Sequence, residues 1–261
     1  MSITFMRKFL RRIYLQLITY YWALFGSSKV PANKFIVFFL PRAGSNLLVD
    51  LINSHPQIRC DYEIFSAHFV NKKPWFPKLY LKGRWAKAKK DFYGYKLNSC
   101  QIGFQGFEAK AFFADLHQQG WKIICIRRKN LLRQAISFFI AQRRKEWVGS
   151  RNNTLTEEIP IDKEELLAKI ERLEKVNQAE EELLGQLPYL NVFYEDDLLN
   201  AEQHQATLDK VFAFLGVESA PVKTDIVKTA ASHKLADVIA NYAEIESFIG
   251  KTKYAHFLYE E

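Results

Sequence analysis

A loop of small and basic residues follows an apolar run near the start of the chain. Residues 35–40 read FIVFFL, which predicts a buried strand that stops at the next residue, a proline. A helical pattern of leucines and isoleucines begins at residue 47. N–H groups at a helix start lack intrahelical acceptors and attract anions, and an arginine in the loop adds a fixed charge. The pattern predicts that a phosphate-like group is bound by Pro41, Arg42, Ala43, Gly44, Ser45 and Asn46.

This loop is similar to a nucleotide phosphate loop but lacks the GxxxxGK[ST] pattern. Because the missing Lys-Ser/Thr pair would supply the usual Mg²⁺ ligand, we expect phosphate binding without a metal ion. Cys60, Cys100 and Cys125 are widely spaced and form no zinc pattern. Their odd number indicates no disulfide framework, so a reducing, cytoplasmic compartment is expected.

A second cationic cluster follows another apolar run, at residues 121–127. Cations at the start of the next helix, with a hydroxyl one turn behind, can hold a second phosphate, although surface helices often carry similar charges. Two anion sites at two strand ends suit a nucleotide phosphorylated at two places. The cluster consists of Arg127, Arg128, Lys129, Asn130, Arg133 and Ser137.

The elements that must position both loops alternate along the chain. We expect strands near residues 35–40, 58–61, 93–97, 121–127 and 189–194. We expect helices after residue 46, within the basic and aromatic stretch 72–96, and at 109–119, 130–147, 162–184, 201–215 and 237–249. The alternation predicts an α/β protein, a three-layer P-loop-like fold whose central, mostly parallel sheet is flanked by helices. Ligands bind at the carboxyl ends of such strands, where both cationic loops would lie.

Composition limits the class of partner. The 261 residues fit one large domain, and 48% hydrophobic residues can build its core. A net charge of +8 favours a nucleotide, a nucleic acid or an anionic membrane surface. No RRM, KH or zinc pattern is present, and a nucleic-acid module would not explain anion loops at two strand ends. We therefore expect no nucleic-acid partner.

Four motifs in order resemble those of one family, the sulfotransferases that use 3′-phosphoadenosine 5′-phosphosulfate (PAPS). PRAGSN at 41–46 looks like their 5′-phosphosulfate loop, and IRRKNLLRQAIS at 126–137 looks like their 3′-phosphate motif. NVFYEDDL at 191–198, followed by VFAFLGV at 211–217, is similar to a later part of these enzymes. The resemblance runs from about residue 35 to the C-terminus. It is closest to bacterial enzymes acting on carbohydrates and glycolipids, such as trehalose, nodulation-factor and lipopolysaccharide sulfotransferases.

The resemblance implies an enzyme that moves a sulfuryl group from PAPS to a hydroxyl of a carbohydrate or glycolipid by in-line displacement. It implies that Arg42 and the loop amides stabilise the leaving 5′-phosphate. It also implies a 3′-phosphate site at Arg128, Arg133 and Ser137, in which Arg128 is the first choice of cation and Arg127 or Arg133 the alternative.

The same resemblance implies which residues would contact the acceptor. In the carbohydrate branch a Glu at the position of Glu63 is proposed as general base, and Asp61 is the fallback carboxylate. Lys96 matches a Lys of related bacterial members and would contact the sulfonate or the acceptor. Cytosolic animal sulfotransferases use a His base, but His55 precedes a proline at a helix end, so we expect it to be structural.

Two departures from the family pattern keep other functions open. Ala43 stands where the loop commonly has Ser, and Arg128 precedes Ser137 by one residue more than usual. The alternatives are a catalytically inactive protein that binds PAPS or 3′,5′-ADP, and a small-molecule kinase of the P-loop class.

Residues 1–34 match no part of that family and precede the expected sulfotransferase domain at 35–261. Four basic residues between positions 7 and 12 stand before an aromatic and aliphatic stretch at 13–25. That stretch is shorter than the roughly 20 residues that span a bilayer. The pattern predicts an interfacial helix at 5–25, peripheral on the inner face of a membrane. A helix packed on the body and a cleaved signal peptide are the alternatives.

Overall fold

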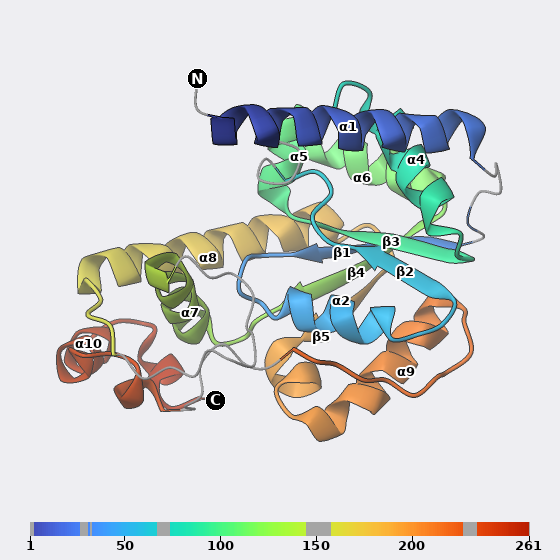
Figure 1. The fold of residues 1–261 in the computed structure, drawn as a ribbon. Coiled ribbons are helices and arrows are strands. Elements are labelled where there is room, and N and C mark those ends of the chain that lie inside the picture. The colour runs from blue at the N-terminus through green and yellow to red at the C-terminus, as the bar shows by residue number, and fades with distance from the viewer. Residues whose placement is uncertain are drawn as a thin grey trace.

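The computed structural model describes residues 3–26, 31, 33–66, 74–144, 158–226 and 234–260. Among them, five strands form one sheet in the order β2-β3-β1-β4-β5, and every neighbouring pair is parallel (Figure 1). The predicted α/β class is confirmed, and every expected strand is present. The strands are β1 (Asn33–Phe39), β2 (Ile58–Asp61), β3 (Phe92–Leu97), β4 (Trp121–Arg127) and β5 (Tyr189–Phe193).

The central position of β1 follows from its composition. Phe35, Val37 and Phe39 belong to one apolar cluster, whereas Ile36 and Phe38 belong to a second on the other face of the sheet. None of the five is more than 3% exposed. A strand buried on both faces reads as a continuous apolar run, which is why residues 35–40 were recognisable from sequence.

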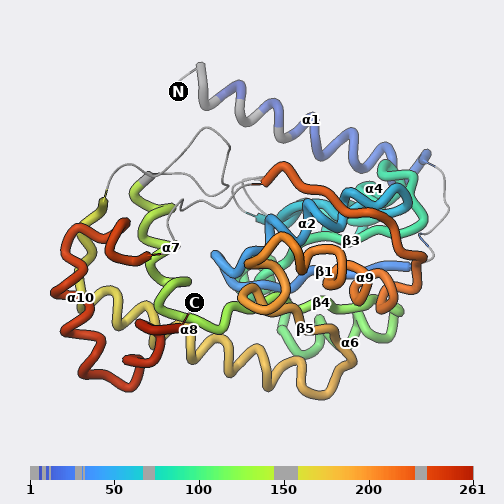
Figure 2. The backbone as a smooth tube through the Cα atoms, turned by 90° about the horizontal axis from the view of Figure 1, so that it is seen from below, coloured from blue at the N-terminus to red at the C-terminus, as the bar shows by residue number. Residues whose placement is uncertain are grey.

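Helices cover both faces of this sheet (Figure 1). One face carries α2 (Ser45–Asn53) and α9 (His204–Leu215), and the other carries α4 (Pro77–Ala88), α5 (Ser99–Gln105) and α6 (Ala109–Gln118). A further apolar cluster joins α7 (Leu131–Arg144), α8 (Lys163–Leu184) and α10 (Tyr242–Ile249). Figures 1 and 2 both place α7 and α10 at the end of the sheet toward which the strands point. Short helical turns occupy Tyr194–Leu198, Ala201–Gln203, Leu235–Asp237 and Ala255–Leu258.

Some boundaries differ from the expected ones. Helix α5 lies outside the expected elements; it is short and starts at a capping box in which Asn98 and Gln101 each accept a hydrogen bond from the other's backbone N–H. Helix α10 starts at Tyr242 rather than at 237, because the residues before it form a separate turn. The expected end of α7 at residue 147 lies outside the described residues.

Helix α1 (Ile3–Phe25) lies along α4, across the top of the molecule in Figure 1. The two backbones touch at Gly83, where a Cβ atom would lie 1.9 Å from the carbonyl oxygen of Thr19. The N-terminal segment is therefore a helix held on the body of the protein. Neither α1 nor any other helix in the described part of the chain combines the length and the apolarity needed to cross a bilayer.

Candidate active site

The two cationic loops leave the sheet side by side. β1 and β4 are direct neighbours, and Phe39 pairs with Ile126 at the carboxyl end of the register. From β1 the strand order continues to β3 and β2 on one side and to β4 and β5 on the other. Ligands of open α/β sheets bind at such a switch in strand order. The expected meeting of both loops is therefore present.

Two residues of the first loop have a left-handed backbone conformation. Arg42 has a φ of 70° and Gly44 has a φ of 87°. A Cβ atom on Gly44 would lie 2.4 Å from Cδ2 of Tyr194, so only glycine fits against this ring. Helix α2 then starts at Ser45, and its first-turn N–H groups have no intrahelical acceptors. The positive φ of Arg42 is the kind of local strain that concentrates at binding sites.

Arg42 links the first loop to the second. Its Nε donates a hydrogen bond to Oγ of Ser137, at 2.9 Å. Burial, and then the positive charge of Arg128, lowers the pKa of Arg42. Two guanidinium groups close enough to repel each other favour an anion between them. The residues present therefore fit a ligand with several negative charges.

Arg128 is fixed from two sides. Its Nε donates to Oε1 of Glu195 at 3.2 Å, and its guanidinium carbon lies 4.9 Å from the ring centroid of Tyr194. Burial lowers the pKa of Arg128. The carboxylate of Glu195 also accepts the backbone N–H of Lys129 at 2.9 Å, and so holds the turn before α7. Tyr194 thus touches both Gly44 and Arg128.

The other two arginines of the second loop are placed differently. Arg127 is buried and forms an ion pair with Glu181 of α8, on the opposite face of the sheet from the loop contacts. Arg133 lies on α7, and its Nε donates to the carbonyl oxygen of Glu260 at 3.2 Å. The geometry favours Arg128 over Arg127 for contact with the first loop.

Glu63 lies just past the end of β2 and is half-buried. Its Oε1 is 3.5 Å from Nζ of Lys96, and its Oε2 accepts a hydrogen bond from Nε2 of Gln101 at 2.8 Å. Lys96, at the end of β3, is 2% exposed and donates to Oδ1 of Asn46. Burial lowers the pKa of Lys96, while Glu63 acts in the opposite direction. A continuous polar chain therefore joins Glu63 to the first loop.

Asp61 is occupied by structural contacts. Its side chain is buried, and Oδ2 accepts from Nη2 of Arg84 at 2.6 Å and from the hydroxyl of Tyr93 at 2.9 Å. Its Oδ1 accepts from Nε of Arg59 at 3.0 Å. These contacts join the end of β2 to α4 and β3, and they favour Glu63 over Asp61 as the carboxylate that faces a substrate.

His55 and Ala43 both belong to the interior. His55 lies past the far end of α2 from the loop, where Nε2 is 3.0 Å from the carbonyl oxygen of Glu218. Ala43 is 0% exposed within the apolar cluster beneath α2, and its N–H donates to the carbonyl oxygen of Leu40 at 3.2 Å. A side chain at position 43 therefore packs in the core, so the absence of a hydroxyl there leaves the polar part of the loop intact.

Three further residues of the site were not singled out from the sequence. Gln101 orients Glu63, Tyr194 packs on Gly44, and Glu195 fixes Arg128. The spacing of Asn98 and Gln101 is a capping-box signal that could have revealed α5. The other two stand in the YEDDL stretch, whose sequence alone gives no direction for either side chain.

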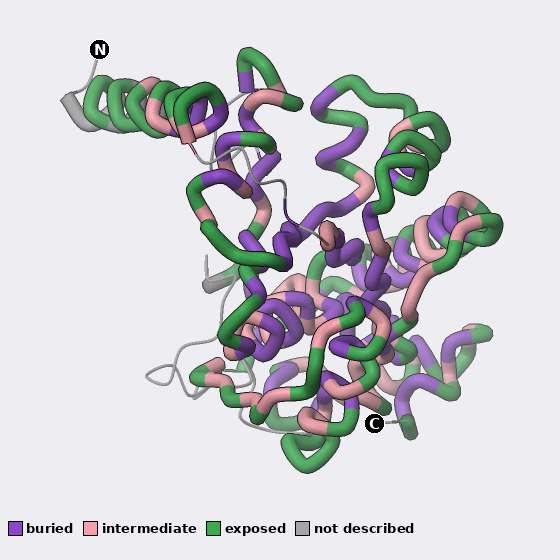
Figure 3. Tube along the Cα trace, turned by 90° about the vertical axis from the view of Figure 1, so that its right-hand side faces the viewer, coloured by how far each residue is buried: buried purple, intermediate pink, exposed green. Residues whose placement is uncertain are grey.

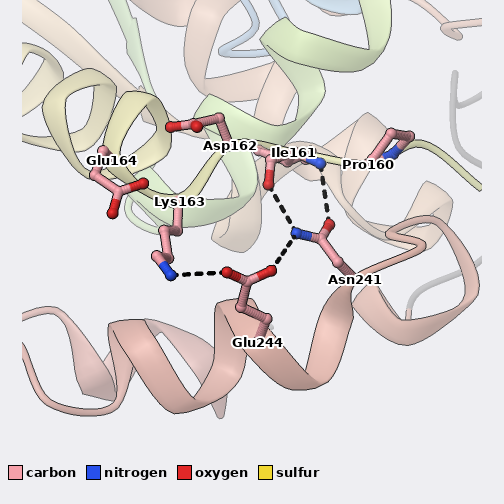
Figure 4. A pocket seen from close by; sticks show the side chains of 7 residues that line it. All are labelled: Pro160, Ile161, Asp162, Lys163, Glu164, Asn241 and Glu244. Carbon is pink, nitrogen blue, oxygen red and sulfur yellow. Dashed lines mark hydrogen bonds and ion pairs between the residues drawn. The ribbon is translucent and has the colours of Figure 1, made fainter.

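A surface hollow elsewhere holds none of the expected site residues (Figure 4). It lies between the starts of α8 and α10, where Asn241 exchanges two hydrogen bonds with the backbone of Ile161. Lys163 donates to Glu244 at 2.8 Å in the same place. Its polar groups bind one another and hold the two helices together. The described residues contain no group of three or more His, Cys, Asp or Glu side chains that could hold a metal ion.

Fold and site together define an α/β protein with a cationic site that fits a multiply charged anion. No protein-family model matches the chain. The chain is 24% identical over 238 residues to Nodulation protein H of Rhizobium tropici, covering 86% of this chain and 92% of that protein. It is 26% identical over 144 residues to Nodulation protein H of Rhizobium meliloti (strain 1021), covering 51% of this chain and 58% of that relative.

A solved sulfotransferase from Alicyclobacillus acidocaldarius has the same fold. The TM-score is 0.50 at 15% identity, and the match covers 89% of this chain and 98% of the other. The chain thus has a sulfotransferase fold, and the resemblance expected from its motifs is confirmed.

Proposed function

We propose that this chain is a PAPS-dependent sulfotransferase that sulfates a hydroxyl of a carbohydrate or glycolipid. The observation that carries the proposal is the contact between the two cationic loops, where Arg42 donates to Ser137, together with the polar chain from the first loop through Asn46 and Lys96 to Glu63. The shared fold supports sulfuryl transfer. The relatives named Nodulation protein H agree with the nodulation-factor branch and support a carbohydrate-type acceptor.

The donor would lie across the two loops. Arg42 and the N–H groups of residues 44–46 would hold the 5′-phosphate and the sulfate attached to it. Arg128, Arg133 and Ser137 would hold the 3′-phosphate. A sulfuryl group carries less negative charge than a phosphoryl group, so guanidinium, ammonium and N–H groups suffice to stabilise the charge that develops during transfer.

Glu63 would act as general base. As the acceptor oxygen attacks sulfur, Glu63 takes the hydroxyl proton, and the bond between sulfur and the oxygen of the 5′-phosphate breaks. The electron pair leaves with the phosphate, where Arg42 stabilises it. Gln101 donates a hydrogen bond to the Glu63 carboxylate and would orient it. Lys96, which contacts both Glu63 and Asn46, would bind a sulfonate oxygen.

Binding of 3′,5′-ADP tests the donor site. Isothermal titration should show tight binding that does not change with Mg²⁺, because protein cations hold both phosphates. ATP should bind more weakly, with or without Mg²⁺. A preference for ATP with Mg²⁺ would instead identify a kinase and reject the proposal.

We also propose that residues 5–25 associate with a membrane surface, so that the domain at 35–261 is peripheral on the inner face. The support is the amphipathic character of α1, whose buried side packs on α4 and whose other side is exposed.

A further inference from the structure

The outward side of α1 carries a continuous apolar stripe. Its members follow one another at alternating intervals of four and three residues, which places them on one face of the helix. Each is between 53% and 63% exposed, and most of α1 has the exposed colour in Figure 3. An exposed apolar surface of this length marks an interaction site. The α1 stripe consists of Leu10, Tyr14, Leu17, Tyr21 and Leu24.

The opposite side of α1 fixes which face is outward. Gln16 is 7% exposed, and its Oε1 accepts hydrogen bonds from the hydroxyl of Tyr20 at 3.1 Å and from the N–H of Trp75 at 3.3 Å. The N–H of Phe76 donates to the hydroxyl of Tyr20 at 3.1 Å. These buried polar contacts hold α1 in one rotation about its axis. The α1 stripe is therefore presented to the outside by the fold.

The formal charges carried by α1 and α4 have one sign. No Asp or Glu precedes Asp50, and none lies between Glu63 and Asp91, so α1 and α4 contain no acidic residue. Such a surface is complementary to an anionic partner and repels a second copy of itself. Its exposed cations in the described helices include Arg7, Arg11, Lys78, Lys82 and Lys87.

Helices α1 and α4 are connected to the part of the site that contains Glu63. Arg84 of α4 binds the carboxylate of Asp61 through Nε at 2.9 Å and Nη2 at 2.6 Å. Asp61 ends β2, two residues before Glu63. Figure 1 shows the N-terminal half of α1 at the end of the molecule toward which the strands point, and in Figure 2 that half lies on the same side as α7. The α1 stripe and the base therefore belong to one connected unit.

We propose that the α1 stripe seats this protein on an anionic lipid bilayer, with the Glu63 side of the site turned toward the lipid head groups. Leucines of the stripe enter the boundary of the acyl chains, tyrosines lie at the level of the head groups, and Arg7 and Arg11 contact anionic lipid. A glycolipid acceptor is then sulfated without leaving the membrane. That last step rests on the proposed sulfotransferase activity, whereas binding to the bilayer does not.

Vesicle sedimentation of the full chain tests whether the α1 stripe binds a bilayer. The wild type should sediment with vesicles of phosphatidylcholine and phosphatidylglycerol, and less with phosphatidylcholine alone. Leu10→Ser/Leu17→Ser/Leu24→Ser should lower the partition coefficient at least about tenfold, because binding scales with the apolar area that enters the bilayer. Tyr259→Ser removes a side chain that is 80% exposed far from α1, and it should leave partitioning unchanged. Each variant is also titrated with 3′,5′-ADP. Unchanged affinity shows that the fold and the donor site are intact, so that lower partitioning reports lost membrane binding.

A second variant keeps the stripe intact. Arg7→Gln/Arg11→Gln should weaken binding to the anionic vesicles and reduce its dependence on salt, since fewer charges contact the lipid. Equal partitioning of the wild type and the triple-serine variant would overturn the proposal, as would a wild type that binds neither vesicle. A lipid-free dimer that the triple-serine variant converts to a monomer in sedimentation velocity would also overturn it, in favour of a second copy on this face.

Discussion

Replacing Gly44 with Ala should damage both the stability and the donor site of this protein. At a φ of 87° an alanine costs about 1–2 kcal/mol relative to glycine. Its Cβ atom would also lie 2.4 Å from Cδ2 and 3.0 Å from Cε2 of Tyr194. Forcing a methyl group against a packed ring costs a further 1–3 kcal/mol, roughly. The sum is a destabilisation of about 2–5 kcal/mol.

Gly120 provides a matched control. It has a φ of 74°, but a Cβ atom there meets nothing within 4 Å. Gly120→Ala should therefore cost only the backbone part, about 1–2 kcal/mol. In thermal unfolding, the midpoint of Gly44→Ala should lie roughly 2–12 °C below that of Gly120→Ala.

The ring of Tyr194 also carries Arg128, so its displacement should reach the donor site. Affinity for 3′,5′-ADP should fall at least about tenfold in Gly44→Ala, which corresponds to ~1.4 kcal/mol. It should stay unchanged in Gly120→Ala. Tyr194→Leu should remove the steric part of the cost of Gly44→Ala in a double-mutant cycle. Equal midpoints for the two glycine variants would show that the contact with Tyr194 adds no cost, and undiminished 3′,5′-ADP affinity in Gly44→Ala would show that Tyr194 does not hold the donor site.

Arg42→Ala should weaken 3′,5′-ADP binding at least about tenfold and lower turnover further, because it removes a charge from the 5′-phosphate; undiminished affinity in titration calorimetry would move that role elsewhere. Asp61→Asn should destabilise the fold by about 2–3 kcal/mol in chemical denaturation, because the partly exposed Arg84 loses its ionic partner. Loss of turnover by Asp61→Asn at unchanged stability would instead make Asp61 the base. Burial raises the pKa of Glu180 from 4.5 to about 7, against the effects of Ser99 and Arg127. Between pH 4.5 and 7, the Glu180 carboxyl keeps its proton in the folded protein but loses it in the unfolded chain. The free energy of unfolding therefore falls by about 3 kcal/mol as pH rises through this range. Glu180→Gln should flatten that part of the pH profile, and an unchanged slope would argue against the burial effect.

The parts of the fold that follow from local signals could be predicted from the sequence. β1 and β4 are continuous apolar runs because both of their faces are buried. The start of α8 is likewise local, since the side chain of Asp162 accepts the N–H of Glu165 at 2.8 Å. The positions of the two cationic loops could be predicted for the same reason, as each is a strand end followed by a helix start.

Contacts between distant segments could not be predicted in this way. Gln101 reaches Glu63 across 38 residues of sequence, from a helix too short to show a clear period. Whether Arg127 or Arg128 turns toward the first loop depends on the residue at which β4 ends, because strand side chains alternate between faces. The packing of the Ala43 side chain in the core also depends on tertiary contacts, namely on the apolar cluster beneath α2.

In the proposed reaction, Glu63 takes the proton of an acceptor hydroxyl while the two loops hold PAPS. Transfer of ³⁵S from labelled PAPS to sugars, glycolipids and lipid extracts, compared between the wild type and Glu63→Gln, tests it most directly. The wild type should label an acceptor, and Glu63→Gln should lower that turnover at least about a hundredfold while 3′,5′-ADP affinity stays nearly the same. Equal turnover by Glu63→Gln and the wild type would exclude Glu63 as the general base.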